Sequence, residues 1–218
     1  MSTIFRVLEK HSCDLDSILA QHSQEVISQP YSWTSKQYLG KQFRRATLDV
    51  IAAKNLWMMH CCVFPKHSSA APIYGFDIVA GPNKVTGAFL DYSPLAEHTL
   101  VDWFGNTVGV YNWNKVRELP QWAKQIFSPH MLAIGNIQTT EELHQVLHLS
   151  LKTLHHYLNN LVVDEGVNSL VTQNYYCQQQ KQNPHTKRVL RALGFEETTV
   201  EDFIQHELFP ECVGSHTG

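Results

Sequence analysis

The hydrophobic pattern divides the chain into a helical beginning, a strand-rich middle and a helical end. Residues 1–28 are predicted to be helical, because Leu15, Ile18 and Leu19 form an apolar stripe at helical spacing. Residues 29–41 are polar and rich in turn-forming residues, so no regular element is expected there. The first third of the chain therefore predicts one helix followed by a loop.

Strand patterns come next in close succession. Residues 43–52 alternate between two faces, and residues 55–64 are apolar on both faces apart from His60, as expected of a central strand covered on both sides. Residues 73–81 and 85–92 are predicted to form a hairpin, because only a short turn around Pro82 and Asn83 separates them.

One more strand is expected, and the pattern then becomes helical. The strand covers residues 130–137 and follows the Pro- and Trp-containing segment 117–129. Thr139 and Glu142 form a capping-box pattern in front of a predicted helix. Leucines then recur every three or four residues and predict one buried helix face: Leu143, Leu147, Leu151, Leu154, Leu158 and Leu161.

Three further helices are predicted after the leucine-rich helix. They cover residues 168–182, a short helix that begins at Asn183 with Pro184 in its first turn and ends at Gly194, and residues 199–209. Antiparallel strands between two sets of helices indicate an α+β fold, a three-layer α/β/α sandwich around an antiparallel sheet. No repeat or linker interrupts the pattern, so residues 1–218 are expected to form one domain.

Composition narrows the possible partners and the compartment. A net charge of -3 with 17% charged residues argues against nucleic acid as a partner. No apolar run approaches the roughly 20 residues that a membrane helix needs, and the N-terminus does not resemble a signal peptide. Five cysteines without CxxC spacing fit reduced thiols, so a cytoplasmic protein is expected.

Two ionisable residues interrupt otherwise apolar strands: His60 in MMHCCVF and Asp77 in IYGFDIVAG. Burial would raise the pKa of Asp77 and make its carboxyl group a usable proton donor near neutral pH. A hydrogen-bonded core histidine and an Asp77 paired with arginine or backbone amides are the structural alternatives. Arg45, Thr47 and Asp49 share one strand face, which spacing alone predicts to be solvated.

Other chemical signatures are weak. No GxGxxG motif joins a strand to a helix, which argues against a dinucleotide site. His144 and His148 lie four residues apart on the leucine-rich helix, but no third ligand is evident, so no metal site is expected. The residue patterns alone predict a covered sheet with a polar acid–base cluster. They do not identify a substrate.

Three stretches together resemble the ferredoxin-dependent bilin reductases. They are QFRRATLDVIAAKNLWMMHCCVFP with the following PIYGFDIVAGPNKVTGAFLDYSP, then RELPQWAKQIFSP, and then YYCQQQKQNPHTKRVLRALG. The resemblance runs from about Gln42 to Phe209, and the phycocyanobilin:ferredoxin oxidoreductases and their phage-type relatives are the most similar branches. It implies a substrate, biliverdin IXα, and electrons that arrive singly from reduced ferredoxin through bilin radical states. It also implies that no metal or organic cofactor is permanently bound.

The resemblance implies roles for particular residues. The family's central acid falls on Asp77 and its partner histidine on His60, which makes them the candidate catalytic pair. The arginine that binds a propionate falls on Arg117, and Thr86 occupies a neighbouring hydroxyl position. A guanidinium group holds a carboxylate with two parallel hydrogen bonds, so Arg117 is expected to anchor the flexible bilin.

The chain departs from the phycocyanobilin-forming branch at two places. Thr47 and Asp49 stand where that branch has a histidine and a glutamate, and Asn183, Pro184 and His185 replace Asn-Asp-Lys. The missing glutamate is associated with reduction of the D-ring vinyl group. We therefore expect phycoerythrobilin, formed through 15,16-dihydrobiliverdin, with Asp49 as the candidate second proton donor and Thr47 and Asn183 beside the substrate.

A cluster of basic residues in one short segment suggests a docking surface for acidic ferredoxin, although a solvated helix face is equally compatible. The cluster comprises Lys181, His185, Lys187, Arg188 and Arg191. A heme oxygenase or a phycobiliprotein lyase is a further candidate partner, and a monomer is expected. The alternatives are a reductase that forms phycocyanobilin or stops at dihydrobiliverdin, and a bilin carrier or lyase that reduces nothing.

Overall fold

The computed structural model describes residues 2–212. The α-helices are α1 (Thr3–Gln21), α2 (Thr99–Val108), α3 (Thr140–Asn159), α4 (Leu170–Lys181), α5 (Pro184–Ala192) and α6 (Glu197–Asp202), with a 3-10 turn η1 (Ala123–Gln125) and a π-helical segment η2 (Phe203–Leu208). The strands are β1 (Ser23–Ser28), β2 (Thr34–Gly40), β3 (Phe43–Ala52), β4 (Trp57–Pro65), β5 (Ile73–Ala80), β6 (Val85–Ser93) and β7 (Leu132–Ile137).

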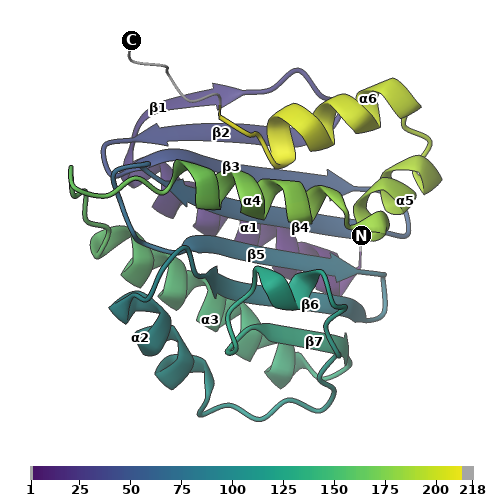
Figure 1. The fold of residues 1–218 in the computed structure, drawn as a ribbon. Coiled ribbons are helices and arrows are strands. Elements are labelled where there is room, and N and C mark those ends of the chain that lie inside the picture. Colours follow the sequence, from purple (N-terminus) through teal and green to yellow (C-terminus); the bar gives the residue numbers. More distant parts are fainter. Residues whose placement is uncertain (1, 213–218) are drawn as a thin grey trace.

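The seven strands form one antiparallel meander in the order β1-β2-β3-β4-β5-β6-β7. In Figure 1, α1 and α3 lie behind the sheet, and α4, α5 and α6 lie in front of it. Residues of α2 belong to the same core as those of α1 and α3. Each face therefore has its own core. Leu15, Phe76 and Leu154 belong to the core behind the sheet, and Phe64, Tyr176 and Phe203 belong to the core in front. The predicted α+β sandwich with a central antiparallel sheet is confirmed.

The helical part of the prediction is largely confirmed. The α3 helix begins after Thr139, whose side chain accepts a hydrogen bond from the Glu142 amide at 3.2 Å. Glu142 does not complete the capping box, because its carboxylate accepts the Asn114 amide at 2.9 Å instead. Asn183 caps α5 and Pro184 is its first residue, while Gly194 follows the helix with a positive φ of 86°.

The N-terminal part of the prediction is wrong in two places. The helix expected over residues 1–28 ends at Gln21, and the remainder forms edge strand β1, five of whose six residues are exposed. The loop expected over residues 29–41 contains β2. An edge strand exposed on both faces carries no alternation, so its sequence does not reveal it.

The hydrophobic pattern also did not predict two helical features, the α2 helix and the division of the last helix. The short α2 helix follows β6 directly and packs against it and against α3. The last predicted helix, over residues 199–209, is divided into α6 and the π-helical segment η2. That division matters for the site, because η2 covers the sheet face at β3, next to the ionisable residues described below.

Candidate functional site

Three ionisable side chains form one row across the middle of the sheet. Asp49 on β3 is opposite His60 on β4, and His60 is opposite Asp77 on β5. Directly paired residues of neighbouring strands project to the same face, so all three face α4, α5 and η2. The His60 Nδ1 atom lies 2.8 Å from Asp77 Oδ1, a hydrogen-bonded pair.

The two carboxyl groups of this row differ in burial. The Asp77 side chain is 46% exposed, so the expectation that Asp77 is buried is wrong. Asp49 is the buried acid, with 4% of the residue exposed. Burial raises the pKa of Asp49 to about 6, and the opposing effects of His60, Ser35 and Arg45 are smaller. Asp49 therefore keeps its proton to a higher pH than an exposed aspartate does, although most molecules are ionised at pH 7.

His60 links the two acids. Its side chain is 14% exposed, and burial by itself would lower its pKa. The Asp77 and Asp49 carboxylates together outweigh burial and raise the pKa of His60 above its ordinary value. The row thus combines a protonatable imidazole with one carboxyl group on each side, and this arrangement can store and deliver protons.

A cavity of about 400 Å³ lies over this row, a size suited to a small-molecule ligand. Its floor is the sheet face from β3 to β6, and its other walls come from the segment before β7, from α4 and α5, and from η2 with Phe209. Most of the lining is apolar and aromatic, with Met58, Phe89, Trp122 and Phe127 as large contributors. Asp49, His60 and Asp77 are the ionisable groups of the floor.

Arg117 lies at the exposed margin of the cavity. Its guanidinium group donates to the Thr86 carbonyl and lies over the Phe89 ring, 5.7 Å from the ring centroid. Gly135 makes room for it, because a Cβ atom there would approach Arg117 Nε to 2.8 Å. Thr86 also lines the cavity, although its hydroxyl donates to the Val79 carbonyl at 3.0 Å.

The structure places the basic segment beside the cavity but neutralises most of it. Lys181 pairs with Glu211 at 2.7 Å, Lys187 pairs with Glu197 and Glu201, and Arg191 pairs with Glu197. Arg188 is exposed, lines the cavity and donates to His185 Nδ1 at 2.8 Å. Asn183 lines the cavity too, while its side-chain oxygen accepts the His185 amide at 3.0 Å.

The β3 face with Arg45, Thr47 and Asp49 is buried, contrary to the solvated face expected from spacing, with exposures of 9%, 3% and 4%. The cover is η2, to which Arg45 donates two hydrogen bonds, at 2.6 Å to the Glu207 carbonyl and 2.7 Å to its carboxylate. Thr47 lies under this cover and does not line the cavity. Nothing in the local sequence indicates a cover that comes from residues 203–208.

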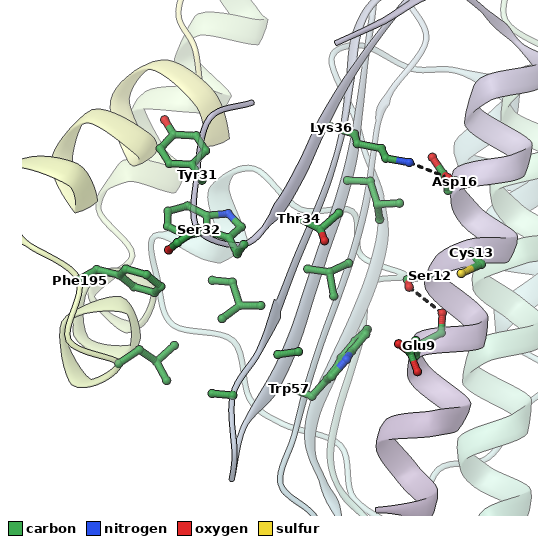
Figure 2. A pocket seen from close by; sticks show the side chains of 17 residues that line it. Glu9, Ser12, Cys13, Asp16, Tyr31, Ser32, Thr34, Lys36, Trp57 and Phe195 are labelled. Carbon is green, nitrogen blue, oxygen red and sulfur yellow. Dashed lines mark hydrogen bonds and ion pairs between the residues drawn. The ribbon is translucent and has the colours of Figure 1, made fainter. Parts of the chain in front are cut away.

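A second hollow, of about 580 Å³, lies beside β2 and β3. Figure 2 shows that its side chains lie on both sides of the strands, with Trp57 and Glu9 on the α1 side and Tyr31 and Phe195 on the other. Two of its charged groups, Lys36 and Asp16, pair with each other at 2.9 Å. None of the predicted site residues lines it, so the cavity over the ionisable row is the candidate site.

Two negative observations concern the described residues. Between residues 2 and 212, no group of three or more His, Cys, Asp or Glu side chains is arranged so that it could hold a metal ion. In the same part of the chain, no helix has both the length and the apolarity that crossing a membrane requires.

An ionisable row beneath a largely apolar cavity is an arrangement that can exchange protons with a mostly apolar ligand. The family model described as "Ferredoxin-dependent bilin reductase" matches residues 3–210. The chain therefore belongs to the ferredoxin-dependent bilin reductase family and is an oxidoreductase.

Two similar curated proteins are phycocyanobilin:ferredoxin oxidoreductases. The chain is 30% identical over 183 residues to the phycocyanobilin:ferredoxin oxidoreductase of Gloeobacter violaceus, covering 79% of this chain and 71% of that protein. It is 30% identical over 176 residues to the enzyme of the same name from Trichodesmium erythraeum, covering 75% and 71%.

Two solved structures have the same fold. A protein named PcyX superposes with a TM-score of 0.70 and 26% identity, over 94% of this chain and 99% of PcyX. Tomato phytochromobilin synthase, solved in complex with biliverdin, superposes with a TM-score of 0.72 and 13% identity, over 95% of this chain and 83% of that one.

Proposed function

We propose that this protein reduces biliverdin IXα with electrons from ferredoxin, and that the bilin lies in the cavity over the ionisable row. The observation that carries the proposal is the His60–Asp77 pair, with 2.8 Å between His60 Nδ1 and Asp77 Oδ1. The Asp77 side chain is 46% exposed and lines a mostly apolar cavity. A tetrapyrrole fits this environment, because its conjugated rings are apolar while its pyrrole nitrogens and lactam oxygens exchange protons. Membership of the ferredoxin-dependent family supports the electron source.

The ionisable row supplies protons to the bilin. Each two-electron reduction takes up two electrons, one at a time from ferredoxin, and two protons. Asp77 donates to the bilin, because its carboxyl group faces the cavity, and His60 passes a proton on to Asp77 through their hydrogen bond. The raised pKa of His60 supports this role, because it keeps the imidazole protonated further toward neutral pH.

The end product is phycoerythrobilin, formed in two steps. The C–D methine bridge is reduced first and gives 15,16-dihydrobiliverdin, and the A-ring diene system is reduced second, so that four electrons and four protons are added in all. Asp49 supplies the second donor. Its pKa of about 6 supports this role, since a carboxyl group that is partly protonated near neutral pH can donate. Thr47 and Asp49, in place of the histidine and glutamate of the phycocyanobilin-forming branch, support this product.

Arg117 anchors a bilin propionate, and Thr86 beside it and Asn183 at the start of α5 contribute further polar contacts. Arg117 is exposed at the edge of the cavity, and Phe89 and the Thr86 carbonyl hold its guanidinium group in place. A preorganised guanidinium group loses less freedom when it binds a carboxylate.

Ferredoxin docks beside α5, where Arg188 lines the cavity. Lys181, Lys187 and Arg191 form the wider surface, but their ion pairs with glutamates reduce the positive potential there. Of these four cations, Arg188 therefore makes the largest contribution to steering an acidic electron carrier. The protein acts as a cytoplasmic monomer, and a heme oxygenase or a phycobiliprotein lyase is a candidate neighbour in the pathway of the pigment.

The test is a single-turnover assay with biliverdin, ferredoxin and a reducing system, followed by absorption spectroscopy and product chromatography. A reductase produces transient radical bands and then a product with a shifted spectrum. A spectrum that forms on mixing and does not change when ferredoxin is reduced would instead identify a bilin carrier. Phycocyanobilin or unconverted dihydrobiliverdin as the end product would overturn the product assignment and leave the reductase activity standing.

A further inference from the structure

One wall of the cavity has almost no regular secondary structure. The segment 117–131 between α2 and β7 contributes Arg117, Trp122, Ala123, Phe127 and Met131 to the lining, and η1 is its one helical turn. A segment of this kind keeps its shape only if particular contacts tie it to the sheet.

At its beginning, the wall is tied to β7 by backbone hydrogen bonds. The Arg117 amide donates to the Ala133 carbonyl at 2.7 Å, and the Gly135 amide donates to the Lys115 carbonyl at 2.9 Å. These bonds pair residues 115–117 with β7 as a short strand would. This pairing ends at Arg117. It leaves Trp122 and Phe127 to be positioned by something else.

At its end, the wall is tied to the buried carboxylate of Asp91 on β6. Asp91 is 2% exposed and accepts hydrogen bonds from the Ser128 hydroxyl at 2.5 Å, from the Ser128 amide at 3.0 Å and from the Ser93 hydroxyl at 2.8 Å. The Ser128 hydroxyl in turn accepts the His130 amide at 3.1 Å. Hydrogen bonds to an ionised carboxylate are stronger than those between neutral groups, so this is the firmest connection of the segment to the sheet.

The anchor lies directly beside the aromatic wall. Phe127 precedes Ser128, packs edge-on against Tyr176 of α4 with the ring centroids 6.4 Å apart, and lies 6.3 Å from the Trp122 ring. The His130 ring lies against Gly105 of α2, where a Cβ atom would come within 2.7 Å of it. Any shift of Ser128 therefore moves the cavity wall on one side and the contact with α2 on the other.

We propose that Asp91 is a positioning residue that shapes the substrate cavity through Ser128. Asp91 does not line the cavity, so it acts on the ligand only through the wall. Its carboxylate fixes the positions of Phe127 and Trp122 relative to the sheet. These positions set the width of the cavity that is available to a flat ligand. The proposal rests on the proposed function, since it takes the bilin to be the ligand of this cavity.

The experiment compares Asp91→Ala, Ser128→Ala and the conservative Asp91→Asn with the control Ser93→Ala. Ser93→Ala removes one hydrogen bond from the same carboxylate and leaves the wall attached. Hydrogen exchange of residues 117–131 is measured without ligand, and biliverdin affinity is measured by titration well below the melting temperature of each variant. We expect faster exchange in this segment and about tenfold or greater weakening of biliverdin binding for Asp91→Ala and Ser128→Ala. Ser93→Ala should change affinity less than about threefold, and Asp91→Asn should restore part of the loss.

The outcomes separate the anchor from the proposed function. Unchanged hydrogen exchange of residues 117–131 in Ser128→Ala would overturn the anchor. This test remains available if Asp91→Ala fails to fold. Faster exchange with unchanged biliverdin affinity would overturn the positioning role. A wild-type protein that binds no biliverdin would overturn the proposed function, while the exchange measurement would still decide whether the anchor exists.

Discussion

Asp49 and Asp77 lie on either side of His60 in one cross-strand row, yet they differ sharply in access to the cavity. The Asp77 side chain is 46% exposed, whereas Asp49 is 4% exposed as a residue. The difference comes from η2, which covers the β3 end of the row and leaves the β5 end open. The two carboxyl groups are therefore expected to contribute to the reaction at different stages.

Replacing Asp77 with asparagine should allow biliverdin to bind and should stop the reaction after the first electron. Asparagine keeps the shape of the side chain but provides no carboxylic proton, so a bilin radical should persist for much longer than in the wild type. Time-resolved absorption after mixing with reduced ferredoxin measures this. Asp102→Asn, an exposed change on α2, is the matched control. Wild-type turnover by Asp77→Asn would show that Asp77 is not the donor.

Replacing Asp49 with asparagine should let dihydrobiliverdin accumulate at the expense of phycoerythrobilin. The first reduction depends on Asp77, which is unchanged, while the second loses its donor. Chromatography of the products after complete turnover distinguishes the two bilins. If Asp49→Asn forms as much phycoerythrobilin as the wild type, the product assignment stands. The second proton would then come from His60 or from a group near Asn183.

The stability of the Asp49→Asn variant should depend on pH in a defined direction. The pKa of Asp49 rises from 3.8 to about 6 on folding, so ionised Asp49 opposes folding. This cost is absent below about pH 4, where the carboxyl group is protonated in both states, and is complete above about pH 6. A shift of about two pKa units corresponds to about 3 kcal/mol.

Denaturant unfolding at pH 8 should therefore show Asp49→Asn to be more stable than the wild type by up to about 3 kcal/mol, and the difference should shrink toward pH 4. Asp102→Asn, measured in parallel, should show no such dependence. A variant that is less stable than the wild type at pH 8 and at pH 4 alike would contradict a net cost of burying ionised Asp49.

Replacing Arg117 with glutamine should weaken biliverdin binding by about 1.5–3 kcal/mol, the range for a hydrogen bond to a charged group. Lys115→Gln removes an exposed cation two residues earlier that does not line the cavity, and it should leave the affinity nearly unchanged. Titration of biliverdin absorption in both variants measures the difference. Equal affinities would remove Arg117 from the binding site.

Reversing the charge of Arg188 should slow reduction by ferredoxin more than reversing Lys187 or Arg191, because glutamates already neutralise the latter two. Lys41→Glu, an exposed change in the turn between β2 and β3, is the control. The effect of Arg188→Glu should diminish as salt rises through the physiological range, where the Debye length is about 8 Å. Rates insensitive to both Arg188→Glu and salt would place the ferredoxin surface elsewhere.

The sequence by itself determined the elements whose signals are local. The leucine spacing of α3, the Thr139 cap and the Asn183–Pro184 start of α5 depend on neighbouring residues, and they were predicted correctly. His60 and Asp77 were also identifiable from the sequence, because an ionisable residue inside an apolar strand is conspicuous wherever the strand lies. Their pairing follows from the strand register, which the structure provides.

Tertiary structure alone decided which carboxyl group is buried. Asp49 belongs to an alternating strand that is compatible with a solvated face, and it is buried because η2, formed by residues 203–208, covers that face. The charges of α5 likewise depend on partners from α6, and the charge of Lys181 at the end of α4 depends on a partner from the C-terminal segment. Burial and ion pairing join residues far apart in the chain, and a local pattern of polar and apolar positions carries no information about such partners.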